Sequence, residues 1–256
     1  MKKFYSRRHF IKTTLAGTFA AGIVQRGWGE ESATSKDPLV FIGTYTSGKS
    51  KGIYTYRFDS SSGALAPAVD AMKADNPSFL AIHPQKKYLY AVNEVSQFNG
   101  RSGGSVSAYS IDSRSGALTL LNQQPSHGQS PCYVSVDHSG KWIFIANYSS
   151  GNIAMYPIQE EGKIGPSTSV IQHTGSSVIA ARQQEPHAHC ILPDPTNRYV
   201  FACDLGIDKI MIYQLDSGNG TLTANTPPSV SAQPGAGPRH FTFHPNGKFA
   251  FLIQEI

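Results

Sequence analysis

Charged residues are scarce in this sequence, at 15% of its 256 residues, and much of its net positive charge lies in one short segment. Residues 1–29 hold six of the 22 basic residues and no acidic one, so the rest of the chain carries 16 basic and 17 acidic groups. A protein that binds nucleic acid needs a basic surface, because its affinity comes largely from releasing counterions from phosphates. We therefore expect no nucleic acid among its partners.

Cysteines and long apolar runs are also few. The three cysteines, Cys132, Cys190 and Cys203, are an odd number without C-x-x-C spacing, which argues against a disulfide framework or a structural zinc site. We expect Cys190 and Cys203 to be buried strand residues. No apolar run reaches the roughly 20 residues of a transmembrane helix, so we expect no stable membrane span. After residue 30 no helical apolar period is evident, which excludes a helix-rich fold.

The first segment has the pattern of an export signal. Residues 6–12 read Ser-Arg-Arg-His-Phe-Ile-Lys, a weakly apolar run follows over 13–24, and the Gly-Trp-Gly stretch at 27–29, with its two small glycines, suits cleavage. Twin-arginine signals direct folded proteins across a bacterial inner membrane. We predict that residues 1–29 are a signal peptide, that the twin-arginine (Tat) export machinery is a partner, and that the mature protein is periplasmic or secreted. The alternative is an ordinary basic amphipathic helix.

One motif recurs four times in the rest of the chain. Each copy has a proline, an apolar run, a tight turn and a second apolar run that ends in polar residues, and the prolines stand at 77, 131, 186 and 238. The steps between them are 54, 55 and 52 residues. A second motif, Tyr-x-apolar-Asp, ends at Asp59, Asp112 and Asp216 and keeps the same period. Two motifs with one period indicate a repeat architecture.

Each repeat reads as four short antiparallel strands in about 53 residues, which is typical of a β-propeller blade. The sequence therefore predicts an all-β fold, a β-propeller of four-stranded antiparallel blades, over residues 38–256. Residues 38–70 supply three strands, three blades follow, and residues 237–256 supply two strands, so about four and a half blades are present. We expect the chain to be truncated at its C-terminal end.

The repeats also predict which side chains meet at one mouth of the central channel. The first two strands of a blade are antiparallel, so the start of the first and the end of the second lie at the same end. The residues directly after the four prolines are Ser78, Cys132, His187 and Arg239. The residues that follow the second strands are Glu94, Tyr148 and Glu255, with Asp204 nearby in the third repeat.

These side chains suit the hydrolysis of an activated ester. A histidine or glutamate can take a proton from water, and an arginine can stabilise the oxyanion. His189 is two positions after His187 and so on the same strand face. No G-x-S-x-G elbow is present, which argues against a serine esterase. The two histidines would suit a metal, but no third ligand is evident, so we expect neither metal nor cofactor.

The structural alternative is simpler. Arg239 and Glu255 can form an ion pair across one hairpin, and His187 and His189 can be ordinary strand residues. Tyr45, after the first visible strand, is a further candidate for the same mouth.

Four motifs carry a resemblance to a known family. Residues 186–189 (Pro-His-Ala-His), 237–240 (Gly-Pro-Arg-His), 43–46 (Gly-Thr-Tyr-Thr) and the glutamate sixteen residues after Arg239 resemble the lactonase family of seven-bladed β-propellers. That family includes a bacterial 6-phosphogluconolactonase and the fungal carboxy-cis,cis-muconate cyclase. The resemblance runs from about residue 39 to 256. It implies seven blades, catalytic roles for the histidine of the Pro-His-x-His strand, Arg239 and Glu255, and a further arginine beyond Ile256.

We therefore predict a hydrolase that opens a small-molecule sugar lactone, acts as a monomer and resembles 6-phosphogluconolactonase. Glu255 or His187 would be the base and Arg239 an electrostatic clamp. The predicted catalytic residues are His187, His189, Arg239 and Glu255, and the predicted substrate-binding residues are Glu94, Tyr148, Asp204 and Tyr45. Because the export signal departs from a cytosolic sugar-phosphate pathway, the family predicts lactone chemistry better than a particular lactone. Two alternatives stay open: a non-catalytic propeller that binds a sugar or a protein, and a muconate-type cycloisomerase.

Overall fold

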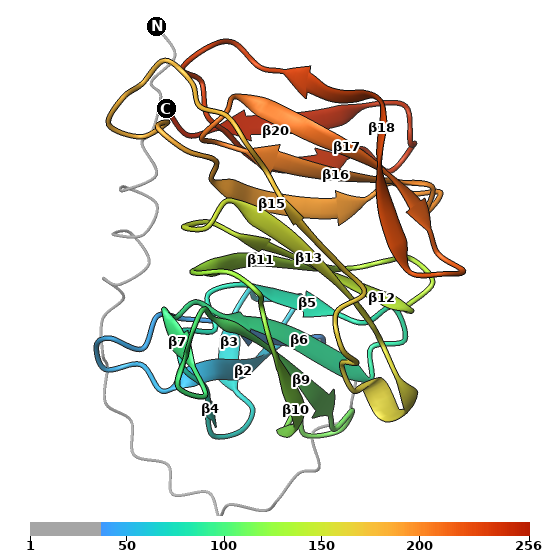
Figure 1. Cartoon of the computed structure of the whole chain (residues 1–256). Coiled ribbons are helices and arrows are strands. Elements are labelled where there is room, and N and C mark those ends of the chain that lie inside the picture. Colours follow the sequence, from blue (N-terminus) through green and yellow to red (C-terminus); the bar gives the residue numbers. More distant parts are fainter. Residues whose placement is uncertain (1–36) are drawn as a thin grey trace, which may run out of the picture. The chain divides into compact units, whose positions relative to one another are not determined.

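A computed structural model describes residues 37–256, which are built almost entirely from β-strands (Figure 1). The described part has a single short helical turn, η1 (Glu160–Gly162). Within it, no helix has the length and apolar character that crossing a membrane requires. The predicted signal peptide, residues 1–29, lies outside the described residues.

The strands form antiparallel sheets that follow one another along the chain, as the repeats predicted. The first sheet has β1 (Leu39–Ile42), β2 (Gly52–Phe58) and an outer edge in two pieces, β3 (Leu65–Pro67) and β4 (Met72–Lys73). The second has β5 (Leu80–Ile82), β6 (Tyr88–Asn93), β9 (Ser105–Ile111) and β10 (Leu118–Pro125). The third has β11 (Pro131–Val136), β12 (Trp142–Asn147), β13 (Asn152–Pro157) and β14 (Ser169–Gln172). The fourth has β15 (Ala188–Pro193), β16 (Tyr199–Asp204), β17 (Lys209–Asp216) and β18 (Thr221–Ser231).

A two-stranded sheet of β19 (Pro238–Phe243) and β20 (Ala250–Gln254) comes last. The predicted all-β fold of four-stranded antiparallel blades is thus confirmed, and the number of sheets matches the predicted four and a half. A small hairpin of β7 (Gln97–Phe98) and β8 (Arg101–Ser102), inserted between β6 and β9, was not predicted.

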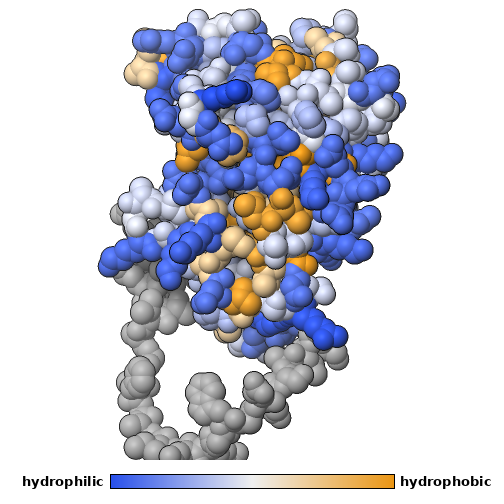
Figure 2. Space-filling view, turned by 60° about the horizontal axis from the view of Figure 1, so that its bottom comes forward, coloured by the Kyte–Doolittle hydropathy of each residue, from blue (hydrophilic) through white to orange (hydrophobic). Residues whose placement is uncertain are grey.

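The core lies between neighbouring sheets rather than inside one. One apolar cluster joins Tyr90 of the second sheet to Ile145 of the third, and another joins Phe144 of the third to Val200 of the fourth. β12 is covered on both faces, by the second sheet on one and by the fourth sheet on the other. All six of its residues are therefore buried, and five of them are apolar. The face shown in Figure 2 is mostly hydrophilic, with apolar patches between the polar residues.

The innermost strands β5, β11, β15 and β19 lie next to one another, so the sheets share an axis as propeller blades do. Three of these strands carry the same irregularity near their first residue. Cys132 in β11, His189 in β15 and Arg239 in β19 each have no partner residue across the strand pair, because the register shifts around them. Such bulges redirect a side chain and often lie next to active sites.

A backbone hydrogen bond closes each of these hairpins at the same end. The N–H groups of Tyr148, Leu205 and Glu255 donate to the carbonyls of Ser130, His187 and Gly237, at 2.9, 3.0 and 2.9 Å. The N–H of Glu94 donates likewise to the carbonyl of Asn76, at 3.0 Å. These bonds define equivalent positions in the four repeats.

These equivalent positions correct how the third repeat was matched to the others from the sequence. In the third repeat Ala188, not Pro186, takes the place of Pro131 and Pro238, because Ala188 pairs with Asp204 as Pro131 pairs with Asn147. The third repeat therefore has two extra residues between Pro186 and the first paired position of its first strand. His189 takes the strand position that the repeat motif had predicted for His187. The prediction that His187 lies at this position was therefore wrong.

Candidate functional site

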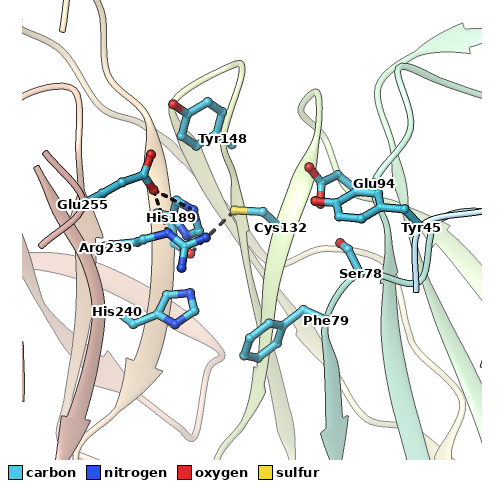
Figure 3. A pocket seen from close by; sticks show the side chains of 10 residues that line it. All are labelled: Tyr45, Ser78, Phe79, Glu94, Cys132, Tyr148, His189, Arg239, His240 and Glu255. Atoms are coloured by element: carbon cyan, nitrogen blue, oxygen red, sulfur yellow. Dashed lines mark hydrogen bonds and ion pairs between the residues drawn. The ribbon is translucent and has the colours of Figure 1, made fainter. Parts of the chain in front are cut away.

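A pocket of about 390 Å³ lies at the end of the inner strands where the bulges occur (Figure 3). Residues of the four later blade sheets and Tyr45, which follows β1 of the first sheet, line the pocket, as expected for a mouth on the propeller axis. Its lining consists of Tyr45, Ser78, Phe79, Glu94, Cys132, Tyr148, His189, Arg239, His240 and Glu255. Six of the eight predicted site residues are among them: Tyr45, Glu94, Tyr148, His189, Arg239 and Glu255.

One wall of the pocket is built around Glu255, which accepts hydrogen bonds from two arginines. Arg239 Nε donates to Oε2 at 2.6 Å, and Arg182 Nη2 donates to Oε1 at 2.5 Å. Burial alone would raise the pKa of Glu255, but the hydrogen bonds from Arg182 and Arg239 outweigh it and lower that pKa. Glu255 is thus held as a carboxylate, and its arginine partners fix its orientation.

Arg182 was not predicted as a site residue. It lies in the segment between β14 and β15, outside the repeated strands, and also donates to the hydroxyl of Tyr148 at 3.3 Å. Its hydrogen bond to Glu255 raises its own pKa, so it stays charged. No repeat motif marks this segment, and the sequence therefore held no signal for the residue.

His189 is the nearest imidazole to this wall. It is 9% exposed, its Nε2 lies 3.9 Å from Glu255 Oε2, and its Nδ1 has no hydrogen-bond partner among residues 37–256. Burial, followed by the charge of Arg239, lowers the pKa of His189 to about 4. At neutral pH His189 is therefore an uncharged base with a free nitrogen beside a fixed arginine.

The opposite wall consists of Tyr45, Ser78 and Glu94. The Tyr45 hydroxyl donates to Glu94 Oε2 at 2.7 Å. Although the residue Tyr45 is 59% exposed, desolvation and then the hydrogen bond to Glu94 raise the pKa of its hydroxyl to about 12, so it remains a donor. The hydroxyl oxygen of Ser78 is buried and has no partner in the described part of the chain. Figure 3 shows this wall facing Arg239 and Glu255 across Cys132.

The remaining lining residues separate or underlie these two walls. Desolvation, with the charge of Glu94, raises the pKa of the Cys132 thiol, so Cys132 is a protonated thiol and not a nucleophile. The ring of Phe79 stacks on Tyr133 at 4.1 Å and meets His240 edge-on at 5.8 Å, which makes the inner end of the pocket aromatic.

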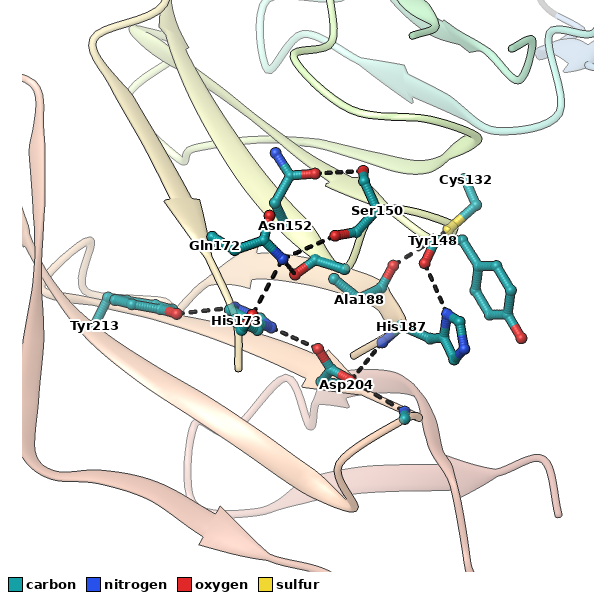
Figure 4. Close-up of polar contacts among 12 residues, drawn as sticks. Cys132, Tyr148, Ser150, Asn152, Gln172, His173, His187, Ala188, Asp204 and Tyr213 are labelled. Atoms are coloured by element: carbon teal, nitrogen blue, oxygen red, sulfur yellow. Dashed lines mark hydrogen bonds and ion pairs between the residues drawn. The ribbon is translucent and has the colours of Figure 1, made fainter. Parts of the chain in front are cut away.

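His187 and Asp204 are not where the sequence placed them (Figure 4). The His187 ring stacks on Tyr148 with centroids 4.6 Å apart, its Nδ1 bonds to the carbonyl of Tyr148 at 3.0 Å, and it is not part of the pocket lining. Asp204 is fully buried and accepts hydrogen bonds from the N–H of His187 at 2.7 Å and from His173 Nδ1 at 2.6 Å. The expectation that Asp204 lies at the mouth was wrong, because it occupies the position of Asn147, one residue before the mouth.

Within residues 37–256 no group of three or more histidine, cysteine, aspartate or glutamate side chains is arranged to hold a metal ion. The polar side chains that line the pocket include the imidazole of His189, the guanidinium of Arg239 and the carboxylate of Glu94, while His189 Nδ1 and the Ser78 hydroxyl are buried atoms without a hydrogen-bond partner among residues 37–256. Such a set can bind a small polyhydroxylated molecule and polarise a carbonyl in it.

Comparison with known proteins agrees with this fold. Residues 39–256 match the family model described as lactonase, 7-bladed beta-propeller. A Bacillus subtilis 6-phosphogluconolactonase is 41% identical over 216 residues, which are 84% of this chain and 59% of the relative. A 6-phosphogluconolactonase of Formosa agariphila is 33% identical over 219 residues, covering 85% of this chain and 61% of the relative.

Among solved structures, the periplasmic gluconolactonase PpgL of Pseudomonas aeruginosa superposes with a TM-score of 0.78 at 36% identity. The match covers 85% of this chain and 61% of PpgL. The chain thus spans about three fifths of the length of the curated relatives that it matches. By its repeats, its sheets and the match over residues 39–256, the chain belongs to the lactonase family of seven-bladed β-propellers.

Proposed function

We propose that this protein hydrolyses a sugar lactone in the pocket between the two walls. The observation that carries the proposal is the arrangement of Arg239, fixed by Glu255, next to the uncharged imidazole of His189 in the pocket lining. The two relatives named 6-phosphogluconolactonase and the solved gluconolactonase support it, because lactone opening is the activity in their names.

Arg239 is suited to the developing negative charge. Its Nε is engaged with Glu255, which leaves the terminal nitrogens of the guanidinium available on the pocket side. When water adds to the lactone carbonyl carbon, the carbonyl oxygen becomes an oxyanion, and a prepositioned arginine lowers the energy of that state. Collapse of the tetrahedral intermediate re-forms the carbonyl and breaks the bond to the ring oxygen, which leaves as an alcohol once it gains a proton.

His189 is the better candidate for the proton transfers. Glu255 accepts a hydrogen bond from an arginine on each of its two oxygens, so it is committed to holding Arg182 and Arg239 in place. His189 is neutral at pH 7 and can take the proton of the attacking water and return it to the ring oxygen. The sequence-based proposal of Glu255 or His187 as base thus shifts to His189, with Glu255 orienting the two arginines.

The test is turnover of glucono-1,5-lactone and its 6-phosphate by the full-length protein, followed by proton release and corrected for spontaneous opening. We expect Arg239→Ala to lower kcat/KM by about 100-fold or more, as loss of an oxyanion donor does. Arg198→Ala is the matched control, because Arg198 is exposed and outside the pocket. Opening of neither lactone faster than in buffer, or an Arg239→Ala variant equal to the parent, would refute the enzymatic role.

We further propose that residues 1–29 are a twin-arginine signal and that residues 38–256 act in the periplasm or outside the cell. Support comes from the Arg7-Arg8 motif and from the periplasmic location in the name of the solved gluconolactonase. Replacing Arg7 and Arg8 by lysine should retain the protein in the cytoplasm of a Tat-competent bacterium, as measured by cell fractionation. Export of the double variant at the parent's level would contradict the proposal.

A further inference from the structure

Arg182 and Arg239 reach Glu255 from two separate segments of the chain. Arg182 lies in the connection between β14 and β15, and Arg239 is the second residue of β19, directly after the connection from β18. The connections are not paired strands, so strand pairing alone does not determine where the two guanidinium groups come to lie. The hydrogen bonds behind both segments lead to one residue, Asp208.

Asp208 is a buried carboxylate in the turn between β16 and β17. It is 4% exposed, and its φ of 52° is a left-handed conformation that aspartate adopts more readily than most residues. Its Oδ2 accepts hydrogen bonds from the Ser177 hydroxyl at 2.5 Å and from the N–H of Gly235 at 2.6 Å. Its Oδ1 accepts one from the N–H of Gly237 at 2.8 Å. Burial alone would raise the pKa of Asp208, but these hydrogen bonds outweigh it and lower that pKa, so Asp208 is ionised.

The hydrogen bond from Ser177 holds the loop that carries Arg182. The N–H of Ser177 donates to the carbonyl of Gln183 at 2.8 Å, which closes the loop between them. Gln183 is fully buried, and its side chain donates to the carbonyl of Leu205 at 2.8 Å, in the same turn as Asp208. The base of the loop is thus bonded twice to the turn between β16 and β17, and Arg182 directly precedes that base.

The hydrogen bonds from Gly235 and Gly237 hold the segment that carries Arg239. Both glycines have left-handed φ values, 85° and 64°, which let the chain turn its N–H groups toward the carboxylate. While the N–H of Gly237 bonds to Asp208, its carbonyl accepts the N–H of Glu255 at 2.9 Å. Gly237 therefore connects Asp208 to the partner of both arginines through its main chain, and Arg239 is two residues farther along.

From these contacts, and resting on the proposed lactone hydrolysis, we infer that Asp208 is a positioning residue, which sets the two arginines around Glu255 without touching the substrate. Asp208 is not part of the pocket lining. A misplacement of about 1 Å at a charge-stabilising group costs up to about 100-fold in rate, so loosening either segment lowers turnover. A carboxylate suits this role because both of its oxygens accept, whereas an amide would turn an NH₂ group toward one of the donors.

Asp208→Asn and Asp194→Asn form a matched pair of variants. Asp194 is 8% exposed, lies in the turn at the other end of β15 and β16, and likewise accepts main-chain N–H groups on both oxygens, from Thr196, Arg198 and Tyr199. We expect similar falls in melting temperature, because each substitution replaces an accepting oxygen by an NH₂ group. For glucono-1,5-lactone, kcat per folded molecule should fall about tenfold to 100-fold in Asp208→Asn and stay within about threefold in Asp194→Asn. Equal kcat values in the two variants would overturn the inference.

Ser177→Ala is the milder variant, since it removes only the hydrogen bond to the loop of Arg182. We expect kcat to fall about threefold, and we expect the double variant with Arg182→Ala to be as slow as Arg182→Ala alone, because both changes act through one side chain. A parent-like rate for Ser177→Ala, or additive losses in the double variant, would contradict the role of Asp208.

The pKa of Glu255 tests the inference without turnover. It is measured by NMR of the carboxyl carbon, assigned by comparison with Glu255→Gln. In Asp208→Asn the arginines are held less firmly, so the lowered pKa of Glu255 should rise toward its usual range, while Asp194→Asn leaves it at the parent's value. If the parent opens neither gluconolactone nor its 6-phosphate, the proposed function is wrong, and this measurement alone decides on Asp208. An unchanged pKa in Asp208→Asn would then refute the positioning role.

Discussion

Two histidine–carboxylate pairs lie within one region of the molecule and differ in every respect that matters for function. His173 and Asp204 are fully buried, their atoms are 2.6 Å apart, and the second nitrogen of His173 bonds to the Tyr213 hydroxyl at 2.9 Å. His189 and Glu255 are 3.9 Å apart, border the pocket, and leave one imidazole nitrogen without a partner in the described chain.

The difference lies in which hydrogen-bonding groups are already used. In the first pair both nitrogens of His173 have a partner. The pair therefore holds the end of β14 to β16 and β17, and neither imidazole nitrogen is left to bind a substrate. In the second pair the arginines occupy the carboxylate and the imidazole remains free. A sequence shows the same residue types in both places, and their roles separate only when the partners are known.

The same substitution at both histidines gives the strongest test of this contrast. We expect His189→Gln to lower kcat about 100-fold to 10,000-fold, because a general base is lost. Its melting temperature should stay within about 2 °C of the parent's, since Nδ1 has no hydrogen bond to lose. Lactone turnover and a thermal melt measure the two quantities, and a large fall in stability with retained turnover would reverse the assignment.

His173→Gln should show the opposite behaviour. Glutamine cannot span Asp204 and Tyr213 together, so a buried carboxylate or hydroxyl loses its partner at a cost of about 2–3 kcal/mol. The melting temperature should fall by about 4–10 °C, while turnover per folded molecule at low temperature stays within about threefold. Loss of turnover without loss of stability would show that the buried pair takes part in catalysis.

The pH dependence of turnover sharpens the assignment of the base. Because the pKa of His189 is lowered to about 4, its uncharged form predominates above that pH and is lost as the pH falls through it. We expect kcat/KM to be level from about pH 5 to 7 and to drop about tenfold for each pH unit below 4. Initial rates corrected for the spontaneous reaction give the profile. A limb near pH 6.5 would indicate an imidazole with an ordinary pKa and contradict the role of His189.

The smallest effect is expected at Arg182, which acts through Glu255 rather than on the substrate. Arg182→Ala removes one of the two hydrogen-bonding arginines, so the pKa of Glu255 moves up toward its usual range and Arg239 is held less firmly. We expect kcat to fall about threefold to tenfold. Arg182→Lys should recover part of the loss, and Arg198→Ala serves again as the exposed control. A parent-like rate for Arg182→Ala would remove it from the site.

Much of the fold followed from the sequence because the repeat is regular. Prolines and aspartates at steps of about 53 residues predicted the sheets, and antiparallel pairing predicted that Glu94, Tyr148, Arg239 and Glu255 meet at one mouth. That inference needs only the order of the strands within each repeat, and the regular spacing of the motifs predicts this order.

The misplaced residues have specific physical causes. The third repeat has two extra residues between its proline and the first paired residue of β15. Counting from the proline therefore placed His187 at the bulge position where His189 lies. Asp204 lies one residue before the mouth, where Leu205 takes the place of Tyr148. Arg182 and the β7–β8 hairpin belong to segments between repeated strands, where no periodicity exists to predict them.

The backbone hydrogen bond that closes each hairpin has a consequence for how such a molecule changes over time. Because Glu94, Tyr148 and Glu255 are held by their main-chain N–H groups and their side chains line the pocket, the hairpin ends do not depend on the chemistry of these three side chains. Two acids and a phenol already stand at these three places. Mutation can therefore alter what the mouth recognises, one position at a time, while the sheets beneath keep their shape.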